Sequence, residues 1–279
     1  MEEAVGKWSK GPIIWEENGT MFASVVFTWD LPFIREWARA YTYSGRRVVV
    51  GGPAVKLMPD YFDSSAEIGG AIDDAVYLHN KDATFTSRGC IRKCSFCAVP
   101  RIEGPLRELT DWPVRPIICD NNLLACSSKH FDGVIDCLKT LSWCDFNQGL
   151  DARLLTKYHA DRLSELKRPL IRLAFDHIKT ESEFMRAYGI LRTAGIPKSC
   201  IRVYVLIGFK DTPDDALYRL QLVNGLGIKP NPMRYQELDA LYRNSYVGAS
   251  WTNGELTRFM RYWSNLRYLG SIPFSEWSG

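Results

Sequence analysis

Strand-like and helix-like stretches alternate through most of this 279-residue chain. From residue 83 onward, short apolar and β-branched runs recur about every 30 residues, and helical patterns lie between them. The predicted strands cover residues 83–87, 116–120, 145–149, 170–176, 202–208 and 234–238. Parallel strands joined by helices form right-handed crossover units, so this alternation predicts a parallel sheet with helices packed on it.

The predicted fold class is therefore α/β, with a partial (β/α)6 TIM-like barrel over residues 84–240. Six strands are too few for the closed eight-stranded barrel, so we expect an open one. In sheets of this kind, ligands and chemistry gather at the carboxyl ends of the strands. The residues that follow each predicted strand are therefore the first candidates for a functional site.

The two ends of the chain have other patterns. Residues 1–83 hold a single βαβ pattern, which predicts a small N-terminal βαβ extension. Residues 241–279 predict a C-terminal helical segment packed on the barrel, because Leu256, Phe259 and Trp263 form an apolar stripe. Arginines and aromatic residues alternate in this segment, a pattern found in nucleic-acid surfaces and in helices that pack on a core.

Three of the eight cysteines stand in one short run after the first predicted strand. Cys90, Cys94 and Cys97 have the spacing C-x-x-x-C-x-x-C. Iron–sulfur clusters are held by cysteine thiolates. Three such ligands suit a 4Fe–4S cluster whose fourth iron stays open to a ligand that is not protein. An open iron of this kind is a place for one-electron chemistry on a bound cofactor.

Two other interpretations of the run remain open. The thiolates would also suit a zinc site whose fourth ligand lies elsewhere in the chain. They would alternatively be buried free thiols, although the run also contains three basic residues that favour solvent, Arg88, Arg92 and Lys93. The other five cysteines form no C-x-x-C pair and are expected to be core or cleft-wall thiols, with a second cluster as the alternative: Cys119, Cys126, Cys137, Cys144 and Cys200.

Composition narrows the setting. The chain has 35 basic and 32 acidic residues, a net charge of +3 that indicates no nucleic-acid partner by itself. No stretch approaches the ~18 apolar residues of a membrane span, and the first residues lack the apolar core of a signal peptide. We therefore expect a cytoplasmic protein without a membrane partner, in a compartment that keeps cysteines reduced.

The cysteine run before a six-fold βα series resembles the radical S-adenosylmethionine superfamily, over about residues 84–238. The resemblance implies one [4Fe-4S] cluster on Cys90, Cys94 and Cys97, with S-adenosyl-L-methionine bound to the open iron. It further implies an enzyme that cleaves this cofactor reductively to a 5′-deoxyadenosyl radical, which abstracts hydrogen from a substrate. An electron donor of the flavodoxin or ferredoxin type is the expected partner.

Finer likenesses point to the methylthiotransferase and cobalamin-binding branches. They lie in Ser87-Arg88-Gly89-Cys90 and in Cys119-Asp120-Asn121-Asn122, which ends the second predicted strand. The resemblance implies cofactor-binding residues at the ends of successive strands: Asp120, Asn121, Asn122, Arg153, Asp176 and Gly208. The first three would receive the methionine amino group, Asp176 the ribose hydroxyls, and Gly208 the adenine. The alternatives are that Asp120 and Asp176 are ordinary strand-end or cap residues, that Arg153 is a surface or helix-start arginine, and that Gly208 only serves a turn.

Two features of those branches are missing. No D-x-H-x-x-G loop or complete flavodoxin-like domain occurs, so cobalamin is not expected. Residues 1–83 contain no cysteine, which disfavours a methylthiotransferase. The substrate stays open among nucleic acid, peptide and small molecule, and no catalytic residue beyond the cofactor site is assigned. A non-catalytic iron–sulfur or zinc module that senses redox state or binds a partner is the alternative function.

Overall fold

The computed structural model describes residues 7–69, 75–265 and 271–278. The chain divides into two compact units. The first unit contains Met1–Thr84, Arg92–Pro105 and Gln236–Ser245. The second unit contains Phe85–Ile91, Leu106–Tyr235 and Tyr246–Gly279.

The first unit is built on a four-stranded sheet of order β1-β2-β3-β4. Its strands are β1 (Ile13–Glu17), β2 (Thr20–Ser24), β3 (Arg47–Gly51) and β4 (Glu67–Ile68). Its helices are α1 (Leu31–Tyr43), α2 (Pro53–Leu57), α3 (Ala75–His79) and α4 (Val99–Ile102). Two 3-10 turns, η1 (Thr28–Asp30) and η2 (Pro59–Tyr61), and the short strand β5 (Ala83–Thr84) complete it.

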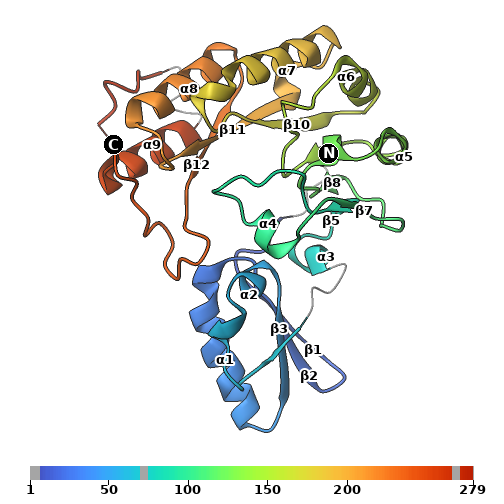
Figure 1. Cartoon of the computed structure of the whole chain (residues 1–279), viewed down its shortest axis with the longest axis vertical. Coiled ribbons are helices and arrows are strands. Elements are labelled where there is room, and N and C mark those ends of the chain that lie inside the picture. Colours follow the sequence, from blue (N-terminus) through green and yellow to red (C-terminus); the bar gives the residue numbers. More distant parts are fainter. Residues whose placement is uncertain (1–6, 70–74, 266–270, 279) are drawn as a thin grey trace. The chain divides into compact units, whose positions relative to one another are not determined.

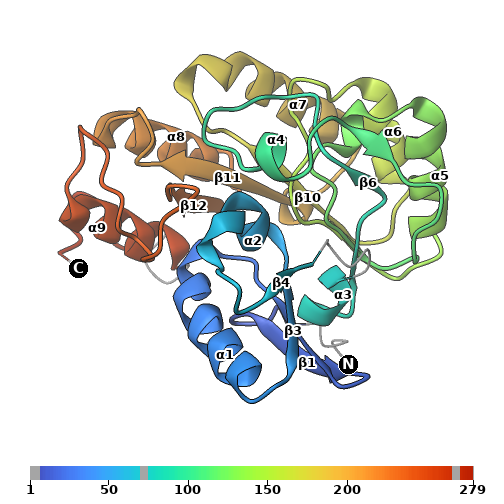
Figure 2. The same cartoon turned by 60° about the horizontal axis from the view of Figure 1, so that its bottom comes forward.

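The βαβ pattern expected at the N-terminus is present as β2, α1 and β3, with the two strands parallel. Helix α1 lies beside β3 in both views (Figures 1 and 2). The unit is larger than the expected pattern, because β1 adds an antiparallel hairpin to β2. The hairpin turns at Asn18 and Gly19, whose φ angles of 49° and 76° are those of a tight two-residue turn. Buried apolar residues from both the sheet and α1 form a separate core.

The second unit carries the parallel sheet, and within it the strands lie in the order β12-β11-β10-β9-β8. These strands are β8 (Ile117–Ile118), β9 (Cys144–Phe146), β10 (Pro169–Ala174), β11 (Ile201–Ile207) and β12 (Pro230–Arg234). A short antiparallel pair, β6 (Ser87–Arg88) and β7 (Arg107–Glu108), lies in the same unit. The helices are α5 (Ser128–Leu138), α6 (Lys157–Ser164), α7 (Glu181–Thr193), α8 (Pro213–Gly225) and α9 (Asn253–Ser264). The 3-10 turns are η3 (Leu123–Ala125), η4 (Ile178–Thr180) and η5 (Lys198–Cys200).

The parallel α/β architecture predicted from the sequence is confirmed, with two changes in the strands. The first predicted strand is split into β5 and β6. The last one lies earlier than the predicted 234–238, at Pro230–Arg234, because two prolines make this run unlike a strand in the sequence. The Tyr235 amide donates to the Ile207 carbonyl, so the odd-numbered residues of β12 face β11. Pro230 and Pro232 therefore point to the open edge, where a missing N–H costs no ladder bond.

The helices cover one face of this sheet. Figure 1 shows α6, α7 and α8 along one side of β10 and β11. Ile171 and Leu173 of β10 are fully buried, whereas the alternate residues Arg172 and Ala174 are partly or largely exposed. Successive strand residues point to opposite faces, so the buried set packs under the helices and the other set lines a more open face.

Helix α9 packs within the second unit. Leu256, Phe259 and Trp263 of α9 are buried in its core. The Arg258 guanidinium donates to the carbonyls of Phe274 and Trp277, at 2.7 and 2.8 Å. These arginine and aromatic side chains therefore serve packing. In the parts of the chain that the structure describes, no helix is long and apolar enough to cross a membrane.

Candidate functional site

Cys90 follows β6, and a buried carboxylate fixes the strand that leads to it. The Thr86 amide and the Ser87 hydroxyl donate to the two oxygens of Asp120, at 2.6 and 2.7 Å, and the Thr86 hydroxyl donates as well. Asp120 is only 3% exposed, and burial raises its pKa despite these donors. Its carboxylate therefore holds the start of the cysteine run against the end of β8.

Asn122 joins Cys90 to the next strand end. Its Nδ2 lies 3.5 Å from the Cys90 sulfur and 3.4 Å from Asp151 Oδ2. The side chain is buried at 2% exposure, and its Oδ1 has no hydrogen-bond partner. Buried amide oxygens almost always have a hydrogen-bond partner in folded proteins, so the unpaired Oδ1 of Asn122 is unusual.

Asp151 connects Asn122 with Arg153 at this edge of the second unit, because its carboxylate accepts hydrogen bonds from both. Arg153 donates to both of its carboxylate oxygens, through Nε at 2.7 Å and a terminal nitrogen at 3.1 Å. The Arg153 amide also donates to Asp151 Oδ1, which closes a turn just after the residues that follow β9. Arg186 of α7 braces this turn, because its guanidinium donates to the carbonyls of Ala152 and Arg153.

Asp176 continues the row after β10. Its Oδ1 accepts a hydrogen bond from the Leu206 amide of β11 at 3.2 Å. Burial raises the pKa of Asp176 to about 6, although that hydrogen bond and the charges of Arg219 and Arg153 oppose the rise. A carboxyl group with this pKa changes its protonation near neutral pH.

A buried arginine holds the ends of β10 and β11 in place. Arg219 of α8 is 1% exposed and donates to the carbonyls of Phe175 and Leu206, at 3.0 and 2.8 Å. It also forms an ion pair with Asp211, whose Oδ1 accepts from the Gly208 amide. These contacts hold the neighbouring strand ends in register.

Gly208 follows β11 with a φ of +85°. A Cβ at this position would lie 3.0 Å from a Leu256 methyl group. Both the left-handed backbone and the contact with α9 therefore require glycine here. These requirements are independent of any approach to an adenine.

Cys94 and Cys97 belong to the first unit, in the segment Arg92–Pro105, whereas Cys90 belongs to the second. The Cys97 amide donates to the Cys94 carbonyl at 3.0 Å, so this part of the run forms a tight turn. All three cysteines of the run are outside any disulfide and partly exposed. Among the residues that the structure describes, no three His, Cys, Asp or Glu side chains are arranged as a metal site.

Of the five remaining cysteines, two are buried and three are partly exposed. Cys119 and Cys144 are buried, and burial raises the pKa of each to about 12. Burial also raises the pKa of Cys126, to about 11. Thiols with such values stay protonated at neutral pH and are poor metal ligands.

The structure thus brings several predicted residues to one edge of the second unit: Cys90, Asn122, Arg153, Asp176 and Gly208. Asp120 also lies there, but its carboxylate faces Thr86 and Ser87. Asn121 is partly exposed beside them. Sequence reasoning missed Asp151 as a site residue. The sequence feature that could have identified Asp151 is its position two residues before Arg153, in a turn that follows a strand.

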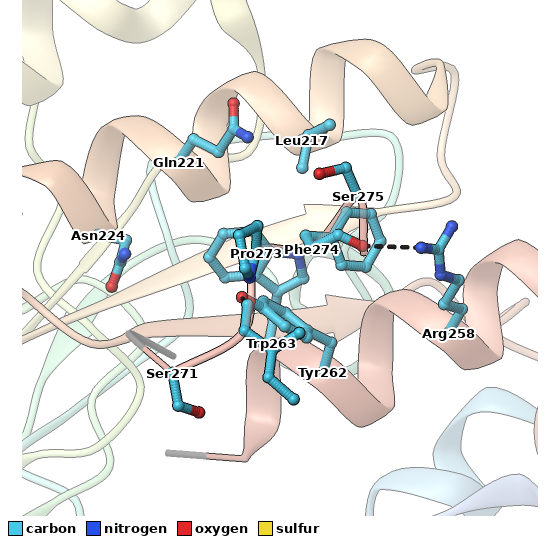
Figure 3. A pocket seen from close by; sticks show the side chains of 11 residues that line it. Leu217, Gln221, Asn224, Arg258, Tyr262, Trp263, Ser271, Pro273, Phe274 and Ser275 are labelled. Carbon is cyan, nitrogen blue, oxygen red and sulfur yellow. Dashed lines mark hydrogen bonds between the residues drawn. The ribbon is translucent and has the colours of Figure 1, made fainter. Parts of the chain in front are cut away.

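A separate pocket lies between α8 and α9 (Figure 3). Its walls include Gln221 and Asn224 of α8, together with Tyr262 and Trp263 of α9. The rings of Phe274 and Tyr262 lie 5.0 Å apart there, edge to face. None of the predicted site residues lines this pocket. Models of known protein families and curated proteins give no match to this chain.

Proposed function

We propose that this chain is a radical S-adenosylmethionine enzyme. The observation that carries the proposal is the run of Cys90, Cys94 and Cys97, with Asn122 of the following strand end in contact with the first sulfur. Four residues span at most about 14 Å when extended, so Cys90 and Cys94 can readily reach one cluster. Cys97 is three residues further on.

The side chains of the run and of Asn122 suit the two groups that the proposal requires. Three partly exposed thiols outside any disulfide would be the donor set for a [4Fe-4S] cluster with one open iron. The buried and unpaired Oδ1 of Asn122 is an acceptor for an amino group close to Cys90. When bound, the cluster would supply the electron that cleaves S-adenosyl-L-methionine to a 5′-deoxyadenosyl radical.

The chain's own residues would bind and orient that cofactor. Asn122 Oδ1, and Asn121 beside it, would accept hydrogen bonds from the methionine amino group. Asp151 holds the Arg153 side chain in an ion pair. The positive charge of Arg153 would therefore lie near the carboxyl ends of the strands, beside the bound cofactor. Asp176 would accept hydrogen bonds from the ribose hydroxyls. Asp120 would act as a positioning residue through Thr86 and Ser87.

We further propose that the sheet is the wall of a partial (β/α)6 barrel. The parallel strands β8 to β12 support this fold, as do helices on one face and half-exposed residues on the other. In such a barrel, the open face and the carboxyl edge would enclose the substrate and keep water from a radical. These residues do not specify the substrate from which the radical would abstract hydrogen. A flavodoxin- or ferredoxin-type protein would deliver the electron.

The test is cofactor cleavage by the full chain. The protein is reconstituted anaerobically with iron and sulfide, reduced with dithionite and given S-adenosyl-L-methionine. We expect 5′-deoxyadenosine, detected by chromatography and mass spectrometry, and none without dithionite. Protein that binds zinc in place of iron, or a reduced cluster that leaves the cofactor intact, would instead support the non-catalytic metal module.

A further inference from the structure

A short loop with unusual backbone angles, residues 208–211, follows β11 at the carboxyl edge of the sheet. Gly208 and Lys210 both have left-handed backbone, with φ angles of 85° and 51°. Positive φ is uncommon for a residue other than glycine, so Lys210 is strained. Strained backbone of this kind persists only where the surrounding contacts fix it, and it clusters at functional sites.

Asp211 supplies contacts that fix the loop. Its Oδ1 accepts hydrogen bonds from the Gly208 amide at 2.9 Å and from the Trp251 indole N–H at 3.0 Å. The same indole N–H lies 3.0 Å from the backbone carbonyl oxygen of Asp211. The other carboxylate oxygen pairs with Arg219. Asp211 is only 8% exposed, so these contacts are shielded from water.

Trp251 reaches Asp211 from the segment that leads into α9. The Trp251 amide donates to the Gly248 carbonyl at 2.9 Å, which closes a turn. A Cβ on Gly248 would lie 2.7 Å from the Gly208 carbonyl oxygen, so glycine lets this turn lie directly against the loop. The Trp251 ring packs edge to face on Phe259 of α9, with 5.1 Å between the ring centroids. The indole is therefore held in one position.

The same contacts extend to Asp176. Arg219, the ion-pair partner of Asp211, donates to the carbonyls of Phe175 and Leu206. Phe175 directly precedes Asp176, and the Leu206 amide donates to the Asp176 carboxylate. A shift of Asp211 would therefore displace both the loop after β11 and the carboxylate after β10.

We infer that Asp211 and Trp251 are positioning residues for the adenosyl half of S-adenosyl-L-methionine. The inference rests on the proposed function, in which Asp176 accepts hydrogen bonds from the ribose hydroxyls. Trp251 fixes Asp211, and Asp211 holds the 208–211 loop and, through Arg219, the surroundings of Asp176. Both positioning side chains are buried, so they act through these neighbours. A site ordered before the ligand arrives binds more tightly, because less ordering is left to binding.

The test compares two tryptophan variants. Trp251→Phe removes the indole N–H and keeps an aromatic ring. Trp263→Phe on α9 is the matched control: Trp263 is also buried, and its Nε1 has no hydrogen-bond partner in the part of the chain that the structure describes (Figure 3). Both variants lose the same ring volume, so a difference between them reports the contacts with Asp211. Asp211 itself is left in place, because its removal would leave Arg219 buried without an ion-pair partner.

Two measurements use the full chain after anaerobic reconstitution. Calorimetry gives the affinity for S-adenosyl-L-homocysteine, which carries the adenosyl half and needs no reduction. We expect Trp251→Phe to bind it about 2- to 12-fold more weakly, the worth of one hydrogen bond, and Trp263→Phe to bind as the parent does. Hydrogen–deuterium exchange of peptides covering residues 206–212 should be faster in Trp251→Phe alone. With S-adenosyl-L-methionine, KM should rise by the same factor while kcat stays unchanged.

Several outcomes would overturn these positioning roles. Equal affinities of Trp251→Phe and Trp263→Phe would do so, whether both match the parent or both are weaker. Unchanged exchange in the loop would also do so. If the parent cleaves the cofactor and Trp251→Phe retains its full affinity, the positioning roles fail and the proposed enzyme stands. A parent that neither binds the analogue nor cleaves the cofactor would refute the proposed function, and this inference with it.

Discussion

The Nδ2 atom of Asn122 lies 3.5 Å from the sulfur of Cys90. This contact joins the first cysteine of the run to the residues that follow strand β8. Asp151 accepts a hydrogen bond from the same nitrogen, so Asn122 is held from two sides. Its unpaired Oδ1 is therefore kept in one position beside the thiol.

Asn122→Ala should reduce cofactor cleavage about 10- to 100-fold, the usual cost of losing a residue that orients a metal ligand. The physical reason is loss of the contact to Cys90 and of the acceptor for the methionine amino group. Initial rates of 5′-deoxyadenosine formation measure the effect. Asn224→Ala on α8 is the control, because Asn224 lines the separate pocket of Figure 3. An Asn122→Ala rate equal to that of the control would refute this role.

Asp176 gives a prediction for stability against pH. Its pKa is about 6 in the folded chain and about 4 in the unfolded chain, so the folded state binds more protons between these values. The contribution of Asp176 to folding is therefore lost as pH rises from about 4 to 6, by up to about 3 kcal/mol. Asp176→Asn keeps an acceptor for the Leu206 amide and should raise the free energy of unfolding at neutral pH by a similar amount.

Urea titrations of the parent and Asp176→Asn at about pH 4 and pH 7.5 measure this difference. The two proteins should have nearly equal free energies of unfolding at the lower pH, where the folded carboxyl group is protonated. A gain of the same size at both pH values would contradict an elevated pKa at this position.

Gly208→Ala should destabilise the chain by about 1–3 kcal/mol, because alanine is strained at positive φ and its Cβ meets Leu256. Gly189→Ala is the matched control. Gly189 lies inside α7 with open space around a Cβ, so alanine there should stabilise by about 0.5–1 kcal/mol. Thermal unfolding of the two variants should therefore move in opposite directions. A Gly208→Ala protein as stable as its parent would show that the turn accepts a side chain.

The sequence was sufficient for the parts of the fold that repeat. Alternating runs predicted the parallel strands, and the turn residues after them predicted where Asn122, Arg153 and Asp176 gather. Pro230 and Pro232 hid the start of β12, because only the finished sheet reveals that their edge is unpaired. The Asn18-Gly19 pair is a sequence signal that predicts the hairpin between β1 and β2.

Side-chain direction was the part that the sequence could not supply. Asp120 and Asn122 are two residues apart, yet Asp120 faces Thr86 and Ser87 whereas Asn122 faces Cys90. The difference depends on hydrogen-bond partners more than thirty positions earlier in the chain: Asp120 accepts from Thr86, and Asn122 donates to Cys90. Asp151 was missed for a related reason, since its partner Asn122 comes from a different strand end.

The most direct test of the central claim is iron and sulfide content after anaerobic reconstitution, measured together with the electron paramagnetic resonance spectrum of the reduced protein. The parent should bind about four irons and four sulfides per chain and give a [4Fe-4S] signal that changes on adding S-adenosyl-L-methionine. Cys90→Ser, Cys94→Ser and Cys97→Ser should each lose the cluster, and Cys137→Ser on α5 should keep it. A parent without iron, or a cluster that survives all three changes in the run, would contradict the account.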